Sequence, residues 1–294
     1  MERIYCSDLA RESAAPLYGS AVSVELWLLL EYPRPWKPKA LQDNDLPEAV
    51  NGHLVKLPQL MAQAGVKLRV QFVKQAESVD NGRPRGMIAD GRTGHLRLIE
   101  GQFEDYQGFA TLTTEDLLAG RLPGARELDE EVLLVCTNGQ RDLCCARFGL
   151  PLYQGLTLEY GQRVWQTTHV GGHRYAPNLV CLPSGLVYGH VTPQAGVDLV
   201  RRHDQGEVAL EKLRGRSALS PAMQAAEYFI RTEVGSRTGQ LEITPVEAGW
   251  SWSLAGQAGT IRVREEAAGM ITASCGAEPK PEFVHLVEEF SIHQ

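Results

Sequence analysis

Residues 131–148, EVLLVCTNGQRDLCCARF, hold an apolar run, a short loop with one glycine, and a segment of helical character. The run predicts a strand over residues 131–135 that ends at Cys136, and the segment predicts a helix over residues 141–148. Cysteines at a strand end and at a helix N-terminus face positive potential, which favours the metal-ligating thiolate. This stretch therefore predicts an α/β unit with a reactive or metal-binding group of cysteines.

The residues that follow extend this unit. Pro151 is expected to open a second helical stretch, because proline is favoured at the first position of a helix. Residues 163–167 are expected to form a strand, and residues 178–191 a hairpin that turns at residues 183–185. An amphipathic helix is expected over residues 193–203, and a further helix that starts at Ser220-Pro221 is expected over residues 221–235. The order β-α-β-β-β-α up to residue 203 is the thioredoxin-like arrangement.

The first part of the chain also alternates strand-like and helix-like segments, with no visible internal repeat. We expect strands at residues 22–30, 66–73 and 95–99, and helices at residues 45–64 and 114–120. Residues 77–94 are expected to form a surface loop, and residues 122–129 a linker. Short alternating runs over residues 241–276 indicate a small antiparallel sheet. The prediction is an α/β protein with an N-terminal α/β domain (1–128), a thioredoxin-like domain (129–238) and a β-rich region (239–294). A thioredoxin-related fold is one alternative for the N-terminal domain.

Composition narrows the classes of function. The 294 residues are 43% hydrophobic and 22% charged, and the net charge of -7 comes with no lysine- or arginine-rich run. Nucleic acid binding needs clustered cations, so it is not expected. The sequence shows neither an apolar run long enough to cross a bilayer nor the apolar core of a signal peptide, which favours a cytoplasmic protein without a membrane partner. Six cysteines are too few for a secreted disulfide scaffold.

A pair of histidines completes the candidate site. His169 and His173 flank Gly171-Gly172, which disfavours a helix and predicts a loop that can fold closely around a ligand. Cys136 and Cys145 have eight residues between them, and 23 residues separate Cys145 from His169. The pattern predicts a metal site with two cysteines and two histidines. Zinc satisfies such a donor set, although eight residues exceed the usual zinc-finger spacing.

Three motifs carry a family resemblance. They are CTxGxRDxCCA (136–146), WxxxHxGGHRYAxN (165–178) and LPxGLxYG (182–189), and together they resemble the sucrase/ferredoxin-like family. That family is related to thioredoxin-like ferredoxins, which hold a [2Fe-2S] cluster with four cysteines. Its members with the His-x-Gly-Gly-His variant, such as the fungal bis-histidinyl proteins, use two cysteines and two histidines. The resemblance runs from about Cys6 to Gly235.

The resemblance implies a function and a ligand set. It implies a [2Fe-2S] cluster held by Cys136, Cys145, His169 and His173, in an electron carrier rather than a stand-alone enzyme, with a redox partner protein. The adjacent Cys144 leaves the choice of second cysteine open. Imidazole ligands raise the reduction potential of a cluster and couple electron uptake to proton uptake. The alternatives are a thiol-disulfide or peroxide enzyme using Cys136 with Cys144 or Cys145, and a structural zinc module.

Overall fold

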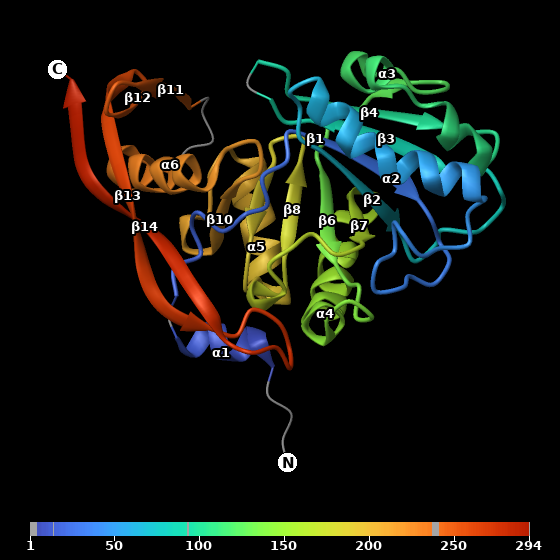
Figure 1. The fold of residues 1–294 in the computed structure, drawn as a ribbon, viewed down its shortest axis with the longest axis horizontal. Coiled ribbons are helices and arrows are strands. Elements are labelled where there is room, and N and C mark those ends of the chain that lie inside the picture. Colours follow the sequence, from blue (N-terminus) through green and yellow to red (C-terminus); the bar gives the residue numbers. More distant parts are fainter. Residues whose placement is uncertain (1–4, 14, 93, 237–240, 294) are drawn as a thin grey trace.

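The computed structural model describes residues 5–13, 15–92, 94–236 and 241–293. A large curled sheet of ten strands forms the body of the molecule (Figure 1). The C-terminal part of the chain forms a separate antiparallel sheet of four strands. The strand order of the large sheet is β10-β9-β8-β6-β7-β2-β1-β3-β4-β5. The predicted mixed α/β class with a C-terminal antiparallel sheet is therefore confirmed.

The second half of the large sheet contains the unit predicted from residues 131–203. Its elements are β6 (Val132–Cys136), α4 (Leu143–Tyr160), β7 (Val164–Thr167), β8 (Leu179–Leu182), β9 (Leu186–Tyr188) and α5 (Pro193–Asp204). Strand β6 pairs in parallel with β7 and antiparallel with β8, which pairs antiparallel with β9. The predicted order of elements, β-α-β-β-β-α, is thus observed.

The first half of the sheet repeats this topology. Its elements are β1 (Leu26–Glu31), α2 (Glu48–Gln63), β2 (Leu68–Lys74), β3 (Arg85–Asp90), β4 (Arg97–Gln102) and α3 (Thr114–Ala119). Strand β1 pairs in parallel with β2 and antiparallel with β3, which pairs antiparallel with β4. The two units join where β2 and β7 pair antiparallel, with Val73 opposite Thr167. The short strand β5 (Arg126–Glu127) forms one edge of the sheet.

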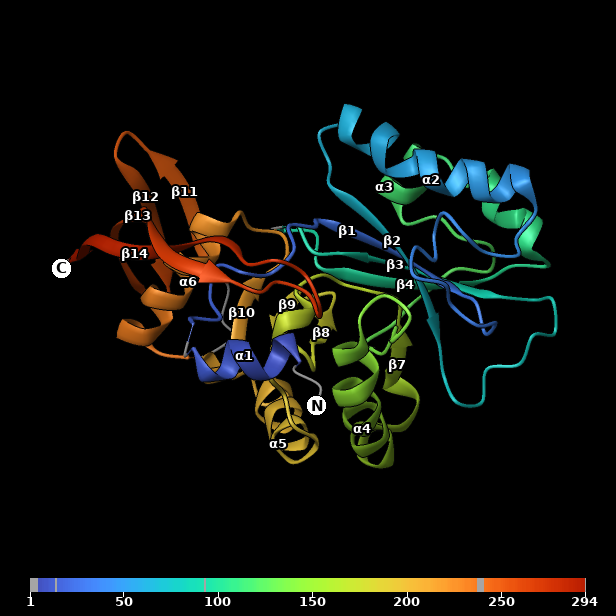
Figure 2. The same ribbon diagram turned by 60° about the horizontal axis from the view of Figure 1, so that its bottom comes forward.

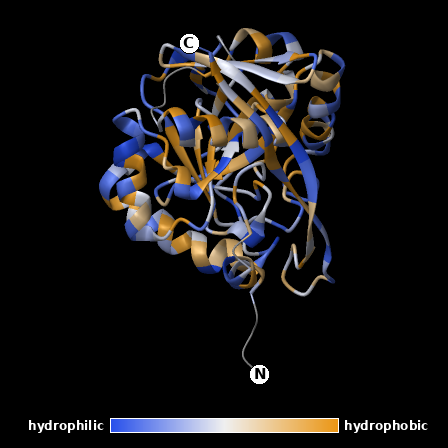
Figure 3. Ribbon diagram, turned by 90° about the vertical axis from the view of Figure 1, so that its left-hand side faces the viewer, coloured by the Kyte–Doolittle hydropathy of each residue, from blue (hydrophilic) through white to orange (hydrophobic). Residues whose placement is uncertain are grey.

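Each unit packs its helices on the outer face of the curled sheet (Figure 2). In the first unit, Leu28 and Leu30 of β1 share a core with Leu54 of α2, and in the second unit Leu133 packs with Leu152 of α4. The opposite face of the sheet forms a core common to both units, with Trp27, Leu29, Leu134, Trp165 and other buried residues. The strands of the large sheet are accordingly mostly hydrophobic (Figure 3).

Two expectations about local structure are wrong. The segment expected as a surface loop, residues 77–94, contains β3, because the buried run Met87-Ile88-Ala89 lies between polar and glycine-rich flanks that mask it. Pro151 does not open a new helix: it lies inside α4, which is continuous from Leu143 to Tyr160. The helices expected to start at Pro193 and Pro221 are confirmed, with Thr192 and Ser220 as N-caps.

The remaining elements complete the sheet edge and the C-terminal region. They are α1 (Cys6–Glu12), β10 (Leu213–Arg216), α6 (Pro221–Val234), β11 (Glu242–Val246), β12 (Gly249–Leu254), β13 (Gln257–Ile271) and β14 (Lys280–His293). The loop that joins β13 to β14 reaches α1, so segments from both ends of the chain lie side by side (Figures 1 and 2). Within the described residues, no helix combines the length and apolar character needed to span a bilayer.

Candidate metal centre

Cys136 and Cys145 are positioned by the end of β6 and the first turn of α4. Cys136 is the last residue of β6, and Cys145 is the third residue of α4. The helix starts at this point because Asp142 is its N-cap and accepts a hydrogen bond from the Cys144 amide at 3.0 Å. Gly149 lets α4 approach the strand, since a Cβ there would lie 2.2 Å from the Cys136 carbonyl oxygen.

The two histidines lie on the connection between β7 and β8. Gly171 and Gly172 have φ values of 93° and 68°, a region that residues with a side chain rarely adopt. The fully buried Arg214 fixes this turn by donating to the Gly171 carbonyl at 3.2 Å and to Asn178 Oδ1 at 2.8 Å. Asn178 in turn donates to the Gly172 carbonyl at 3.0 Å. The loop predicted from Gly171-Gly172 is therefore present and tightly held.

All four residues of the predicted set lie together. The His169 Nδ1 atom is 4.0 Å from Cys136 Sγ and 3.7 Å from Cys145 Sγ. The other ring nitrogen of His169, Nε2, is 3.3 Å from Nδ1 of His173. Cys136, Cys145 and His169 have donor atoms within 4.8 Å of one another, and His173 lies outside this group. The set is elongated, with the sulfurs at one end and His173 at the other.

The electrostatics of the site favour one thiolate. Cys145 and His169 hold the pKa of the Cys136 thiol well below its usual range despite complete burial, whereas Cys136 and burial raise the pKa of Cys145. Burial lowers the pKa of His173, opposed by the carboxylate of Asp142, whose Oδ2 lies 3.8 Å from His173 Nε2. A neutral imidazole and a thiolate are the forms that bind metal.

Side chains of the first unit also support the site. Arg69 and Gln71 on β2 donate to the carbonyl oxygen of His169 at 2.6 and 3.2 Å. Arg69 is a cation close enough to Cys136 for their charges to interact. A surface hollow of about 520 Å³, lined by Arg69, Arg141, His169 and neighbouring residues, opens at this point. His169 therefore has a route to solvent.

Cys144 points away from this set and joins a second group of cysteines. Its Sγ lies 3.6 Å from that of Cys6 and 3.4 Å from that of Cys275. Neither partner was assigned chemistry from sequence, because these residues are 138 and 131 positions from Cys144 and no local motif links them. Cys181 lies apart from both groups, in mid-strand, with Glu131 and His203 as its neighbours.

The donor set can hold a metal or a cluster. Two nitrogen ligands on one tetrahedral metal, with bonds of about 2.0 Å, lie about 3.3 Å apart. The separation of His169 Nε2 and His173 Nδ1 equals this value, so these two atoms suit one metal atom. The Nδ1 atom of His169 and the two cysteine sulfurs also lie within 4.8 Å of one another, as the donors of one metal ion do. The set is therefore compatible with a metal ion or with a cluster.

The fold and the site define a mixed α/β protein with a buried centre of cysteine and histidine donors. The chain belongs to the sucrase/ferredoxin-like family, whose model matches residues 17–215. A stretch of 104 residues is 36% identical to altered inheritance of mitochondria protein 32 of Meyerozyma guilliermondii, covering 31% of this chain and 36% of that protein. The chain thus spans about a third of the length of this curated relative. No solved structure gives a significant match.

Proposed function

We propose that this protein is a one-electron carrier with a [2Fe-2S] cluster, which Cys136, Cys145, His169 and His173 would hold. The convergence of two cysteines and two histidines carries this proposal: both sulfurs lie within 4.0 Å of His169 Nδ1, and His169 Nε2 lies 3.3 Å from His173 Nδ1. Family membership supports it. The cluster would supply reversible one-electron chemistry at a potential raised by its histidine ligands.

The chain's own residues would tune that potential. Arg69 holds the backbone of His169 and places positive charge near Cys136. Arg214 fixes the turn between the histidines and also lies close enough to Cys136 for their charges to interact. Positive charge near the centre favours its reduced, more negative state. We expect a redox partner protein to exchange electrons near the partly buried His169, which lines the hollow described above.

The proposal includes coupling between electron uptake and proton uptake. If His173 binds iron through Nδ1, its Nε2 faces the Asp142 carboxylate at 3.8 Å, the common arrangement of a metal-binding histidine and a supporting carboxylate. The remaining imidazole nitrogens would then take up a proton when the centre gains an electron. A midpoint potential that falls as pH rises is expected, and a potential constant from acid to alkaline pH would contradict the coupling.

The test of the cluster is direct. Anaerobically purified protein should be red-brown, contain iron and inorganic sulfide in equal amounts, and give an electron paramagnetic resonance signal when reduced. Cys136→Ser should lower iron content at least tenfold, whereas Cys181→Ser, at a buried cysteine of β8 outside the site, should leave it unchanged. His169→Cys and His173→Cys should keep a cluster but lower its potential. Unchanged spectra and potential in both would remove the histidines from the ligand set.

One observation favours the thiol-redox alternative, namely the lowered pKa of Cys136 beside Cys145. A reactive thiolate next to a second thiol is what a thiol-disulfide enzyme requires. The same purification separates the two functions. A colourless, iron-free protein with a Cys136–Cys145 disulfide after oxidation would replace the electron carrier with that enzyme, and a colourless protein with zinc bound at these residues would indicate a structural zinc module.

A further inference from the structure

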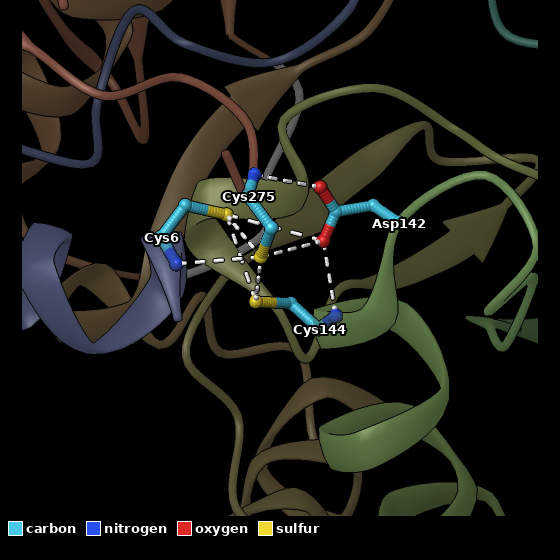
Figure 4. A group of neighbouring side chains, drawn as sticks. All are labelled: Cys6, Asp142, Cys144 and Cys275. Atoms are coloured by element: carbon cyan, nitrogen blue, oxygen red, sulfur yellow. Dashed lines mark hydrogen bonds between the residues drawn. The ribbon is translucent and has the colours of Figure 1, made fainter. Parts of the chain in front are cut away.

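A second group of metal-binding side chains lies beside the proposed cluster. Figure 4 shows the sulfur atoms of Cys6, Cys144 and Cys275 facing one another next to the carboxylate of Asp142. The three Sγ–Sγ distances are 3.6 Å for Cys6–Cys144, 3.4 Å for Cys144–Cys275 and 3.6 Å for Cys275–Cys6. Asp142 Oδ1 lies 3.3 Å from Cys275 Sγ and 4.0 Å from Cys6 Sγ.

These distances match the edges of a single coordination tetrahedron. With zinc–sulfur bonds of about 2.3 Å, two thiolates on one ion lie about 3.8 Å apart. The three sulfurs form a nearly equilateral triangle slightly smaller than that, and the carboxylate oxygen lies near the fourth corner. A disulfide has an S–S bond of about 2.05 Å and joins only two sulfurs, so it does not account for three that converge equally.

The carboxylate of Asp142 is held in place for this role. Its Oδ2 atom accepts hydrogen bonds from Ser274 Oγ at 3.0 Å and from the Cys275 amide at 3.1 Å. Its Oδ1 atom accepts from the Cys144 amide at 3.0 Å and faces the sulfurs. Cys6 and Cys144 are fully buried, and Cys275 is partly buried. Buried donors that converge and are oriented by a second layer of hydrogen bonds are typical of structural metal sites.

We propose that Cys6, Cys144, Cys275 and Asp142 bind one thiophilic divalent cation, of which zinc is the representative. On binding, the three thiols lose their protons to solvent and the thiolates form bonds to the metal. The four negative ligands exceed the charge of the ion, and the N-terminus of α4, where Asp142 and Cys144 lie, provides partial positive charge against the excess. This site is independent of the iron–sulfur proposal.

The location of the site indicates its role. Cys6 lies on α1, Cys144 on α4, and Cys275 on the loop between β13 and β14, so one ion would join three segments far apart in the sequence. Cys144 is next to Cys145, and Asp142 Oδ2 lies 3.8 Å from His173 Nε2. The ion would therefore fasten both ends of the chain beside the candidate cluster and fix the start of α4, which carries ligands of both centres.

The group formed by Glu131, Cys181 and His203 is a weaker candidate. It has one sulfur, and His203 Nε2 already lies 3.1 Å from Glu131 Oε2 in an ion-pair geometry. A thiophilic ion prefers the site with three thiolates.

The experiment measures zinc and iron in the same sample. Full-length protein is purified anaerobically, exposed to zinc and then to EDTA, and analysed by elemental mass spectrometry. We expect one zinc per chain to remain in the wild type and zinc to fall at least tenfold in Cys6→Ser/Cys275→Ser. The matched control is Cys181→Ser, which should keep its zinc. Cys136→Ser should lose iron but keep this zinc, which separates the two centres.

Three outcomes would overturn the second site: no zinc retained by the wild type, zinc retained by the double variant, or a disulfide between any two of these cysteines in protein whose thiols were blocked at cell lysis. Because the double variant can fail to fold, wild-type protein is also loaded with Co²⁺. Thiolate-to-cobalt charge-transfer bands of a tetrahedral site should appear in both the wild type and Cys136→Ser, and their absence would equally refute the site. Iron absent with zinc present would refute the cluster alone.

Discussion

The two units of the large sheet have the same topology but different residues at the same structural position. The central strand of the first unit, β1, ends at Glu31, and the central strand of the second, β6, ends at Cys136. Glu31 is held by Arg85, with Nε–Oε2 and Nη2–Oε1 distances of 2.9 and 3.0 Å. Cys136 instead faces Cys145 and His169. The end of β1 therefore forms an ion pair, whereas the end of β6 bears candidate metal ligands.

The connections differ in the same way. In the first unit, residues 32–47 separate β1 from α2, and they bury Trp36 and Leu46 in the outer core. In the second unit, only residues 137–142 separate β6 from α4, which brings the helix N-terminus and its cysteines to the strand end. The shared topology alone therefore does not produce the candidate metal centre. The loops of the second unit bring its cysteines and histidines together, and Arg69 and Gln71 of the first unit hold the backbone of His169.

The largest effect is expected from matched glycine substitutions in the two β–β connections. Gly172 and Gly82 both have positive φ, 68° and 76°. A Cβ on Gly172 would lie 2.3 Å from Nη2 of the buried Arg214, whereas a Cβ on Gly82 would have no atom within 4 Å. Gly172→Ala should therefore displace the turn between the histidines and lower iron content at least tenfold. Iron analysis and thermal unfolding measure both effects.

Gly82→Ala is the control for the backbone cost alone. It should lower stability by about 1 kcal/mol, the cost of the left-handed conformation for a residue with a side chain, and leave iron content unchanged. If both variants lost iron equally, the tight contact between Gly172 and Arg214 would not be what positions His173.

An intermediate effect is expected at Glu31, the counterpart of Cys136. Burial raises the pKa of this carboxyl, but hydrogen bonds from Arg85 and Ser78 outweigh burial and lower it below its ordinary value of 4.5. The ionised carboxylate therefore stabilises the fold above pH 4.5, and this contribution is lost as pH falls through the lowered value. Glu31→Gln should cost about 2 kcal/mol at neutral pH and progressively less in acid, by urea unfolding.

The iron content of Glu31→Gln should equal that of the wild type, in contrast to Cys136→Ser. Loss of iron from Glu31→Gln would mean that the end of β1 also supports the metal centre. It would contradict the inference that only the end of β6 bears metal ligands.

The second unit could be predicted from sequence further than the first. Continuous apolar strands and strong helix starts, such as Pro193 after Thr192, are local signals, and they gave the order of elements correctly. The buried strand β3 was missed because its apolar run is only three residues long between polar flanks. The repeat of topology is not visible as a repeat of residues, since packing fixes which positions are apolar but not which residues fill them. The alternation of strand-like and helix-like segments nevertheless allowed the alternative of a thioredoxin-related first unit.

The candidate centre was predictable for a different reason. Cys136, Cys145, His169 and His173 lie in two short motifs whose spacing can be read, and the structure brings them together. The second group of cysteines was not predictable, because Cys6 and Cys275 meet only through the packing of α1 against the C-terminal hairpin loop. Contacts between distant segments depend on tertiary structure, and single-sequence patterns report local structure.

The smallest effect is expected from a half-buried histidine, His190, in the second unit. His190 has a positive φ of 53°, and burial, together with Arg11 nearby, lowers its pKa from 6.5 to about 4. An unfolded chain takes up this proton near pH 6.5 and the folded chain only near pH 4. Stability is therefore full above pH 6.5 and falls as pH decreases between the two values.

The variant His190→Asn keeps the left-handed conformation, which asparagine tolerates, and removes the titrating imidazole. Between pH 7.5 and pH 5.5 the wild type should lose about 1 kcal/mol more than the variant in urea unfolding. The same exchange at exposed His95 in the first unit controls for the substitution itself. Parallel stability curves for His190→Asn and the wild type would show that this histidine does not contribute to the loss of stability in acid.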